Sequence, residues 1–169
     1  MTTRPAALIL LGVWLGALLA SWVAASVNFR TVDRVLGPQL RPELERGLAP
    51  VPAPERRAAL RHLASEINRW MFRWWSSAQA VLGLLLLALV WPQRGPRWLA
   101  GAALLIVLVQ LGLTGPIVGL GRSLDFLPRP LPAELARRFR LLHTGYVALD
   151  LAKAAALAGA TVLAARRAR

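Results

Sequence analysis

Four long stretches of this sequence are almost free of charged residues, and they constrain the fold more than any other feature. They cover about residues 6–28, 74–91, 98–117 and 141–165. A helix of ~20 residues rises ~30 Å, which is the thickness of the hydrocarbon core of a bilayer. Peptide groups inside lipid must bond to one another, which makes these stretches helices rather than strands. We therefore predict an all-α integral membrane four-helix bundle, formed by residues 1–169 as a single membrane domain.

The first apolar stretch has a rival interpretation as a cleaved signal peptide. Arg4 precedes the apolar run, and small residues follow it at Ala24, Ala25 and Ser26. A signal-peptide core usually has only ~7–15 apolar residues, however, and this stretch is longer. We expect it to remain as the first spanning helix.

Two polar segments, residues 29–73 and 118–140, connect the spanning helices and are themselves expected to be partly helical. The segment APVPAP at 49–54 interrupts the first, since proline fixes φ and removes a backbone donor. From Glu55 onward, apolar residues recur every three or four positions with arginines between them, which predicts an amphipathic helix. This helix would lie in the membrane interface or pack on another loop helix. Three nearby tryptophans favour the interface: Trp70, Trp74 and Trp75.

The second polar segment, 118–140, is broken by LPRPLP and then reads as a second short amphipathic helix. Just before it, Pro116 is expected to kink or close the third spanning helix. Small residues in LGVWLG at 11–16 and in LGLTGPIVGLG at 111–121, Gly115 among them, are expected to let helices approach closely.

Positive charge is concentrated between the apolar stretches. The formal net charge is +13, from 20 Arg and one Lys against eight acids. Basic patches attract phosphates, which makes nucleic acid one candidate partner. Anionic lipid headgroups lie nearer to these arginines, and we expect the lipid bilayer, not nucleic acid, as their partner. Fourteen of the basic residues lie in the two long loops, and by this count we expect those loops in the cytoplasm and both termini outside.

The fourth stretch carries polar residues that lipid does not tolerate when they are unpaired. His143, Tyr146, Asp150 and Lys153 are spaced so that they fall within an ~80° arc of one helix face. An unpaired charge at a helix centre costs about 2.5–3.5 kcal/mol, so Asp150 and Lys153 should face the bundle interior and pair with each other. Uncharged partners are expected from the other helices, namely Asn28, Gln79, Gln110 and Thr114.

This polar stripe has a functional and a structural interpretation. In the first, Tyr146, Asp150 and Lys153 line a site that handles a small solute or protons, with His143 at its mouth. In the second, the pair and its hydrogen bonds fix the register of the helices. The sequence leaves both interpretations open.

Enzymatic and cofactor functions find little support in the sequence. The chain has no cysteine, which excludes disulfides, thiolate metal ligands and cysteine nucleophiles. His143 could serve as an axial ligand of a haem or chlorophyll, but a lone histidine near a helix start is more often an interfacial hydrogen-bonding group. His62 falls on the polar segment and is expected to be solvated. We predict neither a metal site nor a cofactor, and we expect that the protein is not an enzyme.

The layout resembles the family of four-helix membrane proteins related to transmembrane protein 205, which is also described as a bacterial domain of unknown function. Three stretches carry the resemblance: WLGALLASWVAASVNFRTVDRVLG at 14–37, LTGPIVGLGRSLDF at 113–126 and FRLLHTGYVALDLAKAAAL at 139–157. Phe139, Leu142, His143 and Pro116 match its motifs. Asp150 stands where the family usually has Asn, and Tyr146 where Ser is common. The resemblance implies a four-helix bundle and no established reaction.

Two functions therefore remain as hypotheses. In the first, the protein carries a solute or protons through the stripe of the fourth helix, as a multi-pass protein of the bacterial inner membrane. Alternatively, it is a structural or accessory subunit of a larger membrane complex, such as an energy-converting assembly, or it forms a homo-oligomer.

Overall fold

The computed structural model describes residues 4–37, 41–128 and 130–166, and these form five helices and no strand. Four helices are long and one is a single short segment in the first loop. Their bounds are α1 Arg4–Val35, α2 Pro42–Leu48, α3 Ala53–Val90, α4 Arg94–Leu124 and α5 Ala133–Arg166. The all-α prediction is confirmed.

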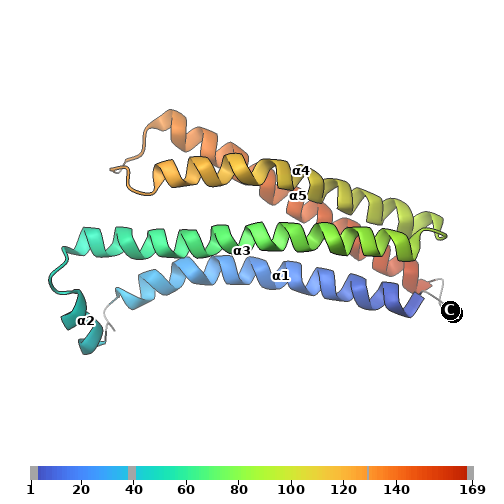
Figure 1. The fold of residues 1–169 in the computed structure, drawn as a ribbon, viewed down its shortest axis with the longest axis horizontal. Helices are drawn as coiled ribbons and strands as arrows, with labels where there is room; N and C mark the ends of the chain where they lie inside the picture. Colours follow the sequence, from blue (N-terminus) through green and yellow to red (C-terminus); the bar gives the residue numbers. More distant parts are fainter. Residues whose placement is uncertain (1–3, 38–40, 129, 167–169) are drawn as a thin grey trace.

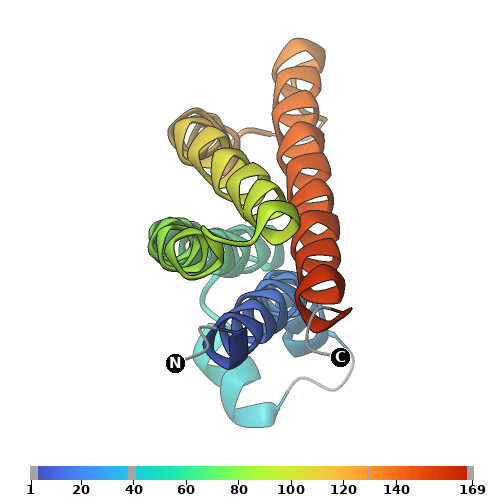
Figure 2. The same cartoon turned by 90° about the vertical axis from the view of Figure 1, so that its right-hand side faces the viewer.

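The four long helices form an antiparallel bundle in which each packs against two neighbours. The contacts follow the order α1–α3–α4–α5 and return from α5 to α1. Figures 1 and 2 show that the start of α1, the short α3–α4 turn and the end of α5 lie at one end of the bundle. The short helix α2 and the α4–α5 connection lie at the other end, which we call the long-loop end.

All four long helices are long and apolar enough to cross a membrane. Their lengths are 32, 38, 31 and 34 residues, so even the shortest rises about 46 Å against a hydrocarbon core of ~30 Å. Each helix therefore extends beyond the lipid core. These are the features of a multi-pass membrane protein.

The helices are longer than the spanning segments expected from hydropathy. Residues 55–73 do not form a separate loop helix, because α3 runs without interruption from Ala53 to Val90. No proline or glycine occurs between Glu55 and Gly83, so nothing in that stretch ends a helix. The prolines of the APVPAP segment lie before α3 and within its first turn, where a missing backbone donor costs nothing.

The third spanning helix differs from expectation in the same way. Pro116 lies inside α4 and does not close it, since α4 continues to Leu124. The expected short helix after LPRPLP is the first part of α5, which begins at Ala133. Proline removes one hydrogen bond from the helix interior, and the turns on either side of Pro116 still form.

One close contact between helices depends on a glycine that the sequence patterns did not single out. A Cβ added at Gly83 would lie 2.8 Å from Cδ1 of Leu104 and 3.1 Å from the ring of Trp14. This glycine lets α3 pack tightly between α4 and α1, at the centre of an apolar core that includes Leu86, Val107 and Leu157. Among the glycines of 11–16 and 111–121, only Gly121 bears out the expected close approach within the bundle, since a Cβ there would lie 3.2 Å from Nη2 of Arg69. At the other five glycines of these stretches, no atom of another part of the bundle lies within 4 Å of an added Cβ. They are Gly12, Gly16, Gly112, Gly115 and Gly119.

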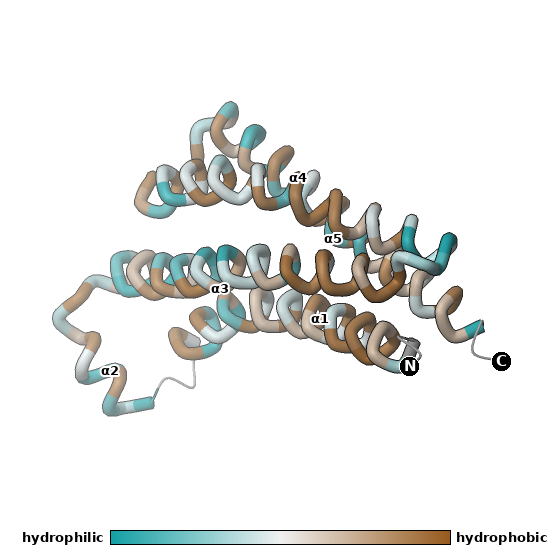
Figure 3. Tube along the Cα trace, turned by 45° about the vertical axis from the view of Figure 1, so that its right-hand side comes forward, coloured by the Kyte–Doolittle hydropathy of each residue, from teal (hydrophilic) through white to brown (hydrophobic). Residues whose placement is uncertain are grey.

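The apolar face of the amphipathic stretch in α3 points away from the bundle. Leu63, Ile67, Trp70 and Trp74 are between 48% and 65% exposed. Figure 3 shows the hydrophilic segments of α3 gathered toward the long-loop end and its apolar segments toward the α3–α4 turn. Outward apolar side chains beside tryptophans are typical of the boundary between lipid and headgroups. The stretch thus lies on the spanning helix itself and does not pack on α2.

Candidate functional site

The two charges of the fourth spanning helix form an ion pair inside the bundle. Nζ of Lys153 lies 2.7 Å from Oδ1 of Asp150, one helical turn away on α5. Lys153 is fully buried and Asp150 is 6% exposed. Lys153 lies 13 residues from Arg140 and 13 from Arg166, which places the pair near the middle of the span.

Gln110 of α4 bonds to both members of the pair. Its Nε2 donates to Oδ1 of Asp150 at 2.8 Å, and its Oε1 accepts from Nζ of Lys153 at 2.7 Å. The Gln110 side chain is 1% exposed. A carboxamide is suited to this position because one end donates and the other accepts. Two hydrogen bonds from Gln110 therefore link the pair on α5 to α4.

The first helix completes the site through a tryptophan. Nε1 of Trp22 donates to Oδ2 of Asp150 at 3.1 Å, so both carboxylate oxygens accept hydrogen bonds. Three helices thus supply the groups around one carboxylate. In a low-dielectric interior, a charge that accepts several hydrogen bonds and faces an opposite charge is far less costly than an isolated one.

α3 is joined to α1 and to α5 through separate hydrogen bonds. Oγ of Ser76 lies 3.3 Å from the hydroxyl of Tyr146, and Nε1 of Trp14 donates to Oε1 of Gln79 at 3.2 Å. Ser76 and Gln79 are each 1% exposed. Together with the network around Asp150, these bonds connect all four long helices.

The structure brings together only part of the predicted stripe. Asp150, Lys153 and Gln110 form one network, whereas the hydroxyl of Tyr146 bonds to Ser76. His143 is exposed and stacks on Phe139 at 5.8 Å between ring centroids, outside the network.

The remaining expected partners bond elsewhere. Gln79 bonds to Trp14, as described above. Asn28 donates from Nδ2 to Oδ1 of Asn68, which links α1 to α3. The Thr114 hydroxyl donates to the backbone oxygen of Gln110 at 2.8 Å, on its own helix.

A second polar cluster lies nearer the long-loop end, between α3 and α4. It consists of His62, Glu66 and Arg69 of α3, Arg122 of α4, and Asp125, which caps α4. Arg69 holds Asp125 with two hydrogen bonds of 2.7 and 2.9 Å and also bonds to Glu66 at 2.7 Å. Arg122 holds Glu66 with two bonds of 2.9 and 2.8 Å. Two guanidinium groups therefore neutralise two carboxylates.

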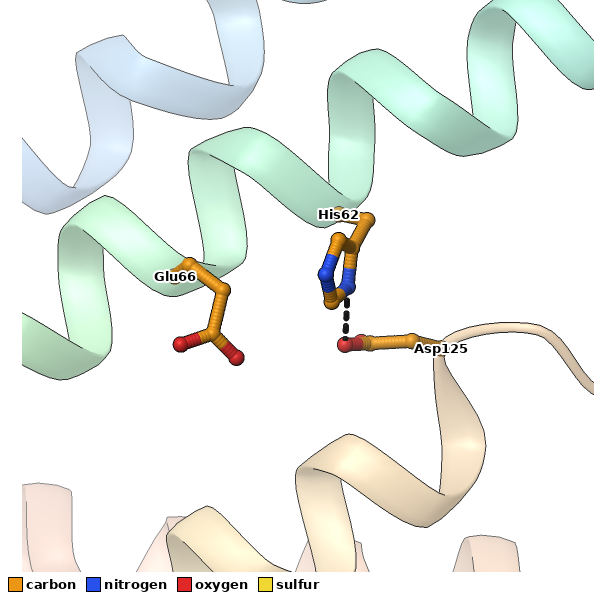
Figure 4. A group of neighbouring side chains, drawn as sticks. All are labelled: His62, Glu66 and Asp125. Carbon is orange, nitrogen blue, oxygen red and sulfur yellow. Dashed lines mark hydrogen bonds and ion pairs between the residues drawn. The ribbon is translucent and has the colours of Figure 1, made fainter.

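His62 belongs to this cluster and is not simply solvated, contrary to expectation. Its Nδ1 lies 2.8 Å from Oδ2 of Asp125, and Figure 4 shows the two side chains meeting across the α3–α4 gap. The sequence gives no local signal for the contact, because 63 residues separate the two positions. His62 on α3 can reach Asp125 at the end of α4 only because the two helices are antiparallel.

Three residues of the cluster have the donor types of a metal site. One ligand atom from each of His62, Glu66 and Asp125 lies within 4.8 Å of the others. Both carboxylates, however, already accept bonds from guanidinium groups at 2.9 Å or less. A divalent cation would have to displace Arg69 and Arg122 against charge repulsion. The geometry is that of an ion-pair network that joins two helices.

Asp125 has a shifted pKa in this cluster. Burial acts to raise its pKa, but the hydrogen bonds from Arg69 and His62 outweigh burial and hold the pKa below 3.8. Its side chain is 11% exposed. Gly121 leaves space for this contact, because a Cβ there would lie 3.2 Å from Nη2 of Arg69.

Comparisons with known proteins add no family to this description. No protein-family model matches the chain, and neither the curated proteins nor the solved structures compared with it give a match.

Proposed function

We propose that this chain is a non-enzymatic structural or accessory component of a larger membrane assembly. The observation that carries the proposal is the hydrogen bonding of the buried pair to α1 and α4. Both oxygens of Asp150 accept bonds, and the ammonium of Lys153 is fully buried between Asp150 and Gln110. Groups held in this way stabilise one arrangement of helices. The lack of cysteine and of a catalytic motif in the sequence agrees with a non-enzymatic role.

The outer surface of the bundle supports an assembly role. Gly12 and Gly16 of α1 are four residues apart, as are Gly115 and Gly119 of α4. None of the four would bring a Cβ within 4 Å of another part of the bundle. Small residues at this spacing let the backbone of a neighbouring membrane helix approach closely, and the chain does not use them for its own packing.

The test is whether the protein associates with other membrane proteins through these faces. After mild-detergent extraction and native electrophoresis, we expect the chain in a species larger than its monomer. Gly16→Leu should shift it toward the monomer, because the larger side chain blocks close approach. Gly145→Leu is the matched control, since Gly145 also has open space but has Leu141 and Leu149 four residues away. A wild-type protein that migrates only as a monomer would contradict the proposal.

A second candidate function is the handling of protons or a small solute at the buried pair. It is favoured by one observation: a carboxylate and an ammonium lie together near mid-span, where charge is rare and commonly functional. In liposomes, a carrier should lose its flux when Asp150→Asn or Lys153→Met is introduced. If both variants retain the wild-type flux, this function is excluded.

The membrane context of the proposal follows from sequence. We also propose that the chain belongs to the family related to transmembrane protein 205. It would reside in the bacterial inner membrane, with its long loops in the cytoplasm. The orientation is supported by the fourteen basic residues in and around residues 29–73 and 118–140. Cleavage of a protease site inserted after Gly37 in inverted vesicles and in intact cells would test it.

A further inference from the structure

The short turn between α3 and α4 presents arginine and tryptophan at the end of the bundle opposite the charged cluster. α3 ends at Val90 and α4 begins at Arg94, so only three residues join them. Trp91 is 59% exposed and Trp98 is 71% exposed. Figure 2 shows this turn at the same end as both termini.

Arg97 is held between the two exposed indoles. Its guanidinium carbon lies 5.3 Å from the ring centroid of Trp91 and 5.3 Å from that of Trp98. One N–H also donates to the backbone oxygen of Trp91 at 3.4 Å. Contact with ring faces leaves the in-plane N–H groups of a guanidinium available for an anion.

The arginines that the structure describes at this end of the bundle form no ion pair with a carboxylate. No Asp or Glu occurs in residues 1–32, 67–124 or 151–169. Across the described part of the chain, no carboxylate lies within 4.0 Å of Arg94, Arg97 or Arg166. The first turn of α4 has no acidic residue, although the positive end of a helix favours one. A phosphate bound there would neutralise this charge.

The turn also lies at the depth of a headgroup. Trp70 of α3 and Trp91, the residue that caps the end of α3, are 21 residues apart, which corresponds to about 31 Å at the rise of an α-helix. This distance matches the ~30 Å hydrocarbon core, so exposed tryptophans mark both of its boundaries. Arg94 and Arg97 therefore lie at the level of lipid phosphates.

We infer that the α3–α4 turn binds the phosphate of an anionic phospholipid through Arg94 and Arg97. Trp91 and Trp98 hold the guanidinium of Arg97 in place and contact the upper part of the acyl chains. The occupant is a lipid because the tryptophans extend the basic surface into the apolar zone. The inference does not depend on the proposed assembly role.

Native mass spectrometry of the full chain in detergent, titrated with phosphatidylglycerol or phosphatidylcholine, tests this inference. We expect the first phosphatidylglycerol to bind more tightly than the first phosphatidylcholine. Arg94→Gln with Arg97→Gln should weaken phosphatidylglycerol binding by about 25-fold, about fivefold for each arginine, from ~1 kcal/mol per basic residue at an anionic surface.

The matched control is Arg138→Gln with Arg140→Gln, which removes two exposed arginines at the long-loop end. It should change the first binding constant by less than about twofold, since those arginines lie outside the proposed site. Equal weakening by both pairs would show nonspecific attraction and overturn the inference, as would equal wild-type affinity for the two lipids.

Two further variants keep the test informative if the double variant misfolds. Arg94→Gln alone changes an exposed side chain and should lower affinity about fivefold, from the same ~1 kcal/mol per basic residue. Arg97→Lys keeps the charge but loses the planar group between the indoles, so it should bind with intermediate affinity. Wild-type lipid affinity in Arg94→Gln would remove that residue from the site and overturn the inference.

Discussion

Replacing Lys153 with Met should destabilise the bundle strongly, although Met is the more apolar residue. The substitution leaves the Asp150 carboxylate buried with hydrogen bonds from Gln110 and Trp22 but without a counter-charge. Removing one partner of a buried ion pair costs about 3–5 kcal/mol. Because Lys153 is fully buried and Asp150 only 6% exposed, little solvent screening reduces this value.

A second substitution should reverse most of the loss. In Asp150→Asn with Lys153→Met, the new carboxamide can donate to Oε1 of Gln110 and accept from its Nε2, which are the two groups that the pair now satisfies. No charge remains buried. We expect the double variant within about 1.5 kcal/mol of wild type, since replacing a buried pair by uncharged groups is often close to neutral. Asp150→Asn alone leaves an unpaired ammonium and should cost about 2.5–3.5 kcal/mol.

Reversible unfolding in bicelles with increasing SDS, followed by circular dichroism, measures these free energies. The double-mutant cycle should give a coupling of several kcal/mol between the two positions. Losses below about 1 kcal/mol for both single variants would refute the reasoning, because a buried unpaired charge cannot be that inexpensive. Additive losses in the double variant would refute it as well.

Three further predictions concern packing and the charged cluster. Gly83→Ala should destabilise by about 1–3 kcal/mol in the same unfolding assay, because its Cβ would lie 2.8 Å from Leu104. Gly16→Ala should stabilise the isolated monomer by up to about 1 kcal/mol, since alanine favours helix and meets nothing there; a marked loss would mean that this face packs internally. The folded-state pKa of Asp125 lies below its unfolded value of 3.8, so its contribution to stability is complete above that pH and is lost as pH falls through the folded-state pKa. Asp125→Asn should therefore flatten the fall in stability below pH 3.8 in an acid titration, and an unchanged profile would contradict the role of the Arg69 contact.

Some features of the site were predictable because they are local to one helix. Asp150 and Lys153 share a helix face by spacing alone, and the cost of unpaired charge in lipid requires that they pair. Gln110 could be named as a candidate partner because amides are rare in apolar helices. The sequence could not show that Gln110, and not Gln79, contacts the pair. Trp22 was missed because a tryptophan in an apolar stretch is expected to serve as a hydrophobic residue.

The sequence by itself determined that four apolar helices form and that their only mid-span charges must meet, because lipid leaves peptide groups and ions no other partners. Only the tertiary structure decided which helices are neighbours, and with that which side chains from distant positions come into contact. The Arg69–Asp125 and Trp22–Asp150 contacts join residues 56 and 128 positions apart. The direction of each glycine was decided in the same way, since a small residue has the same appearance in the sequence whether it faces a neighbouring helix, as Gly83 does, or the outside of the bundle, as Gly16 does.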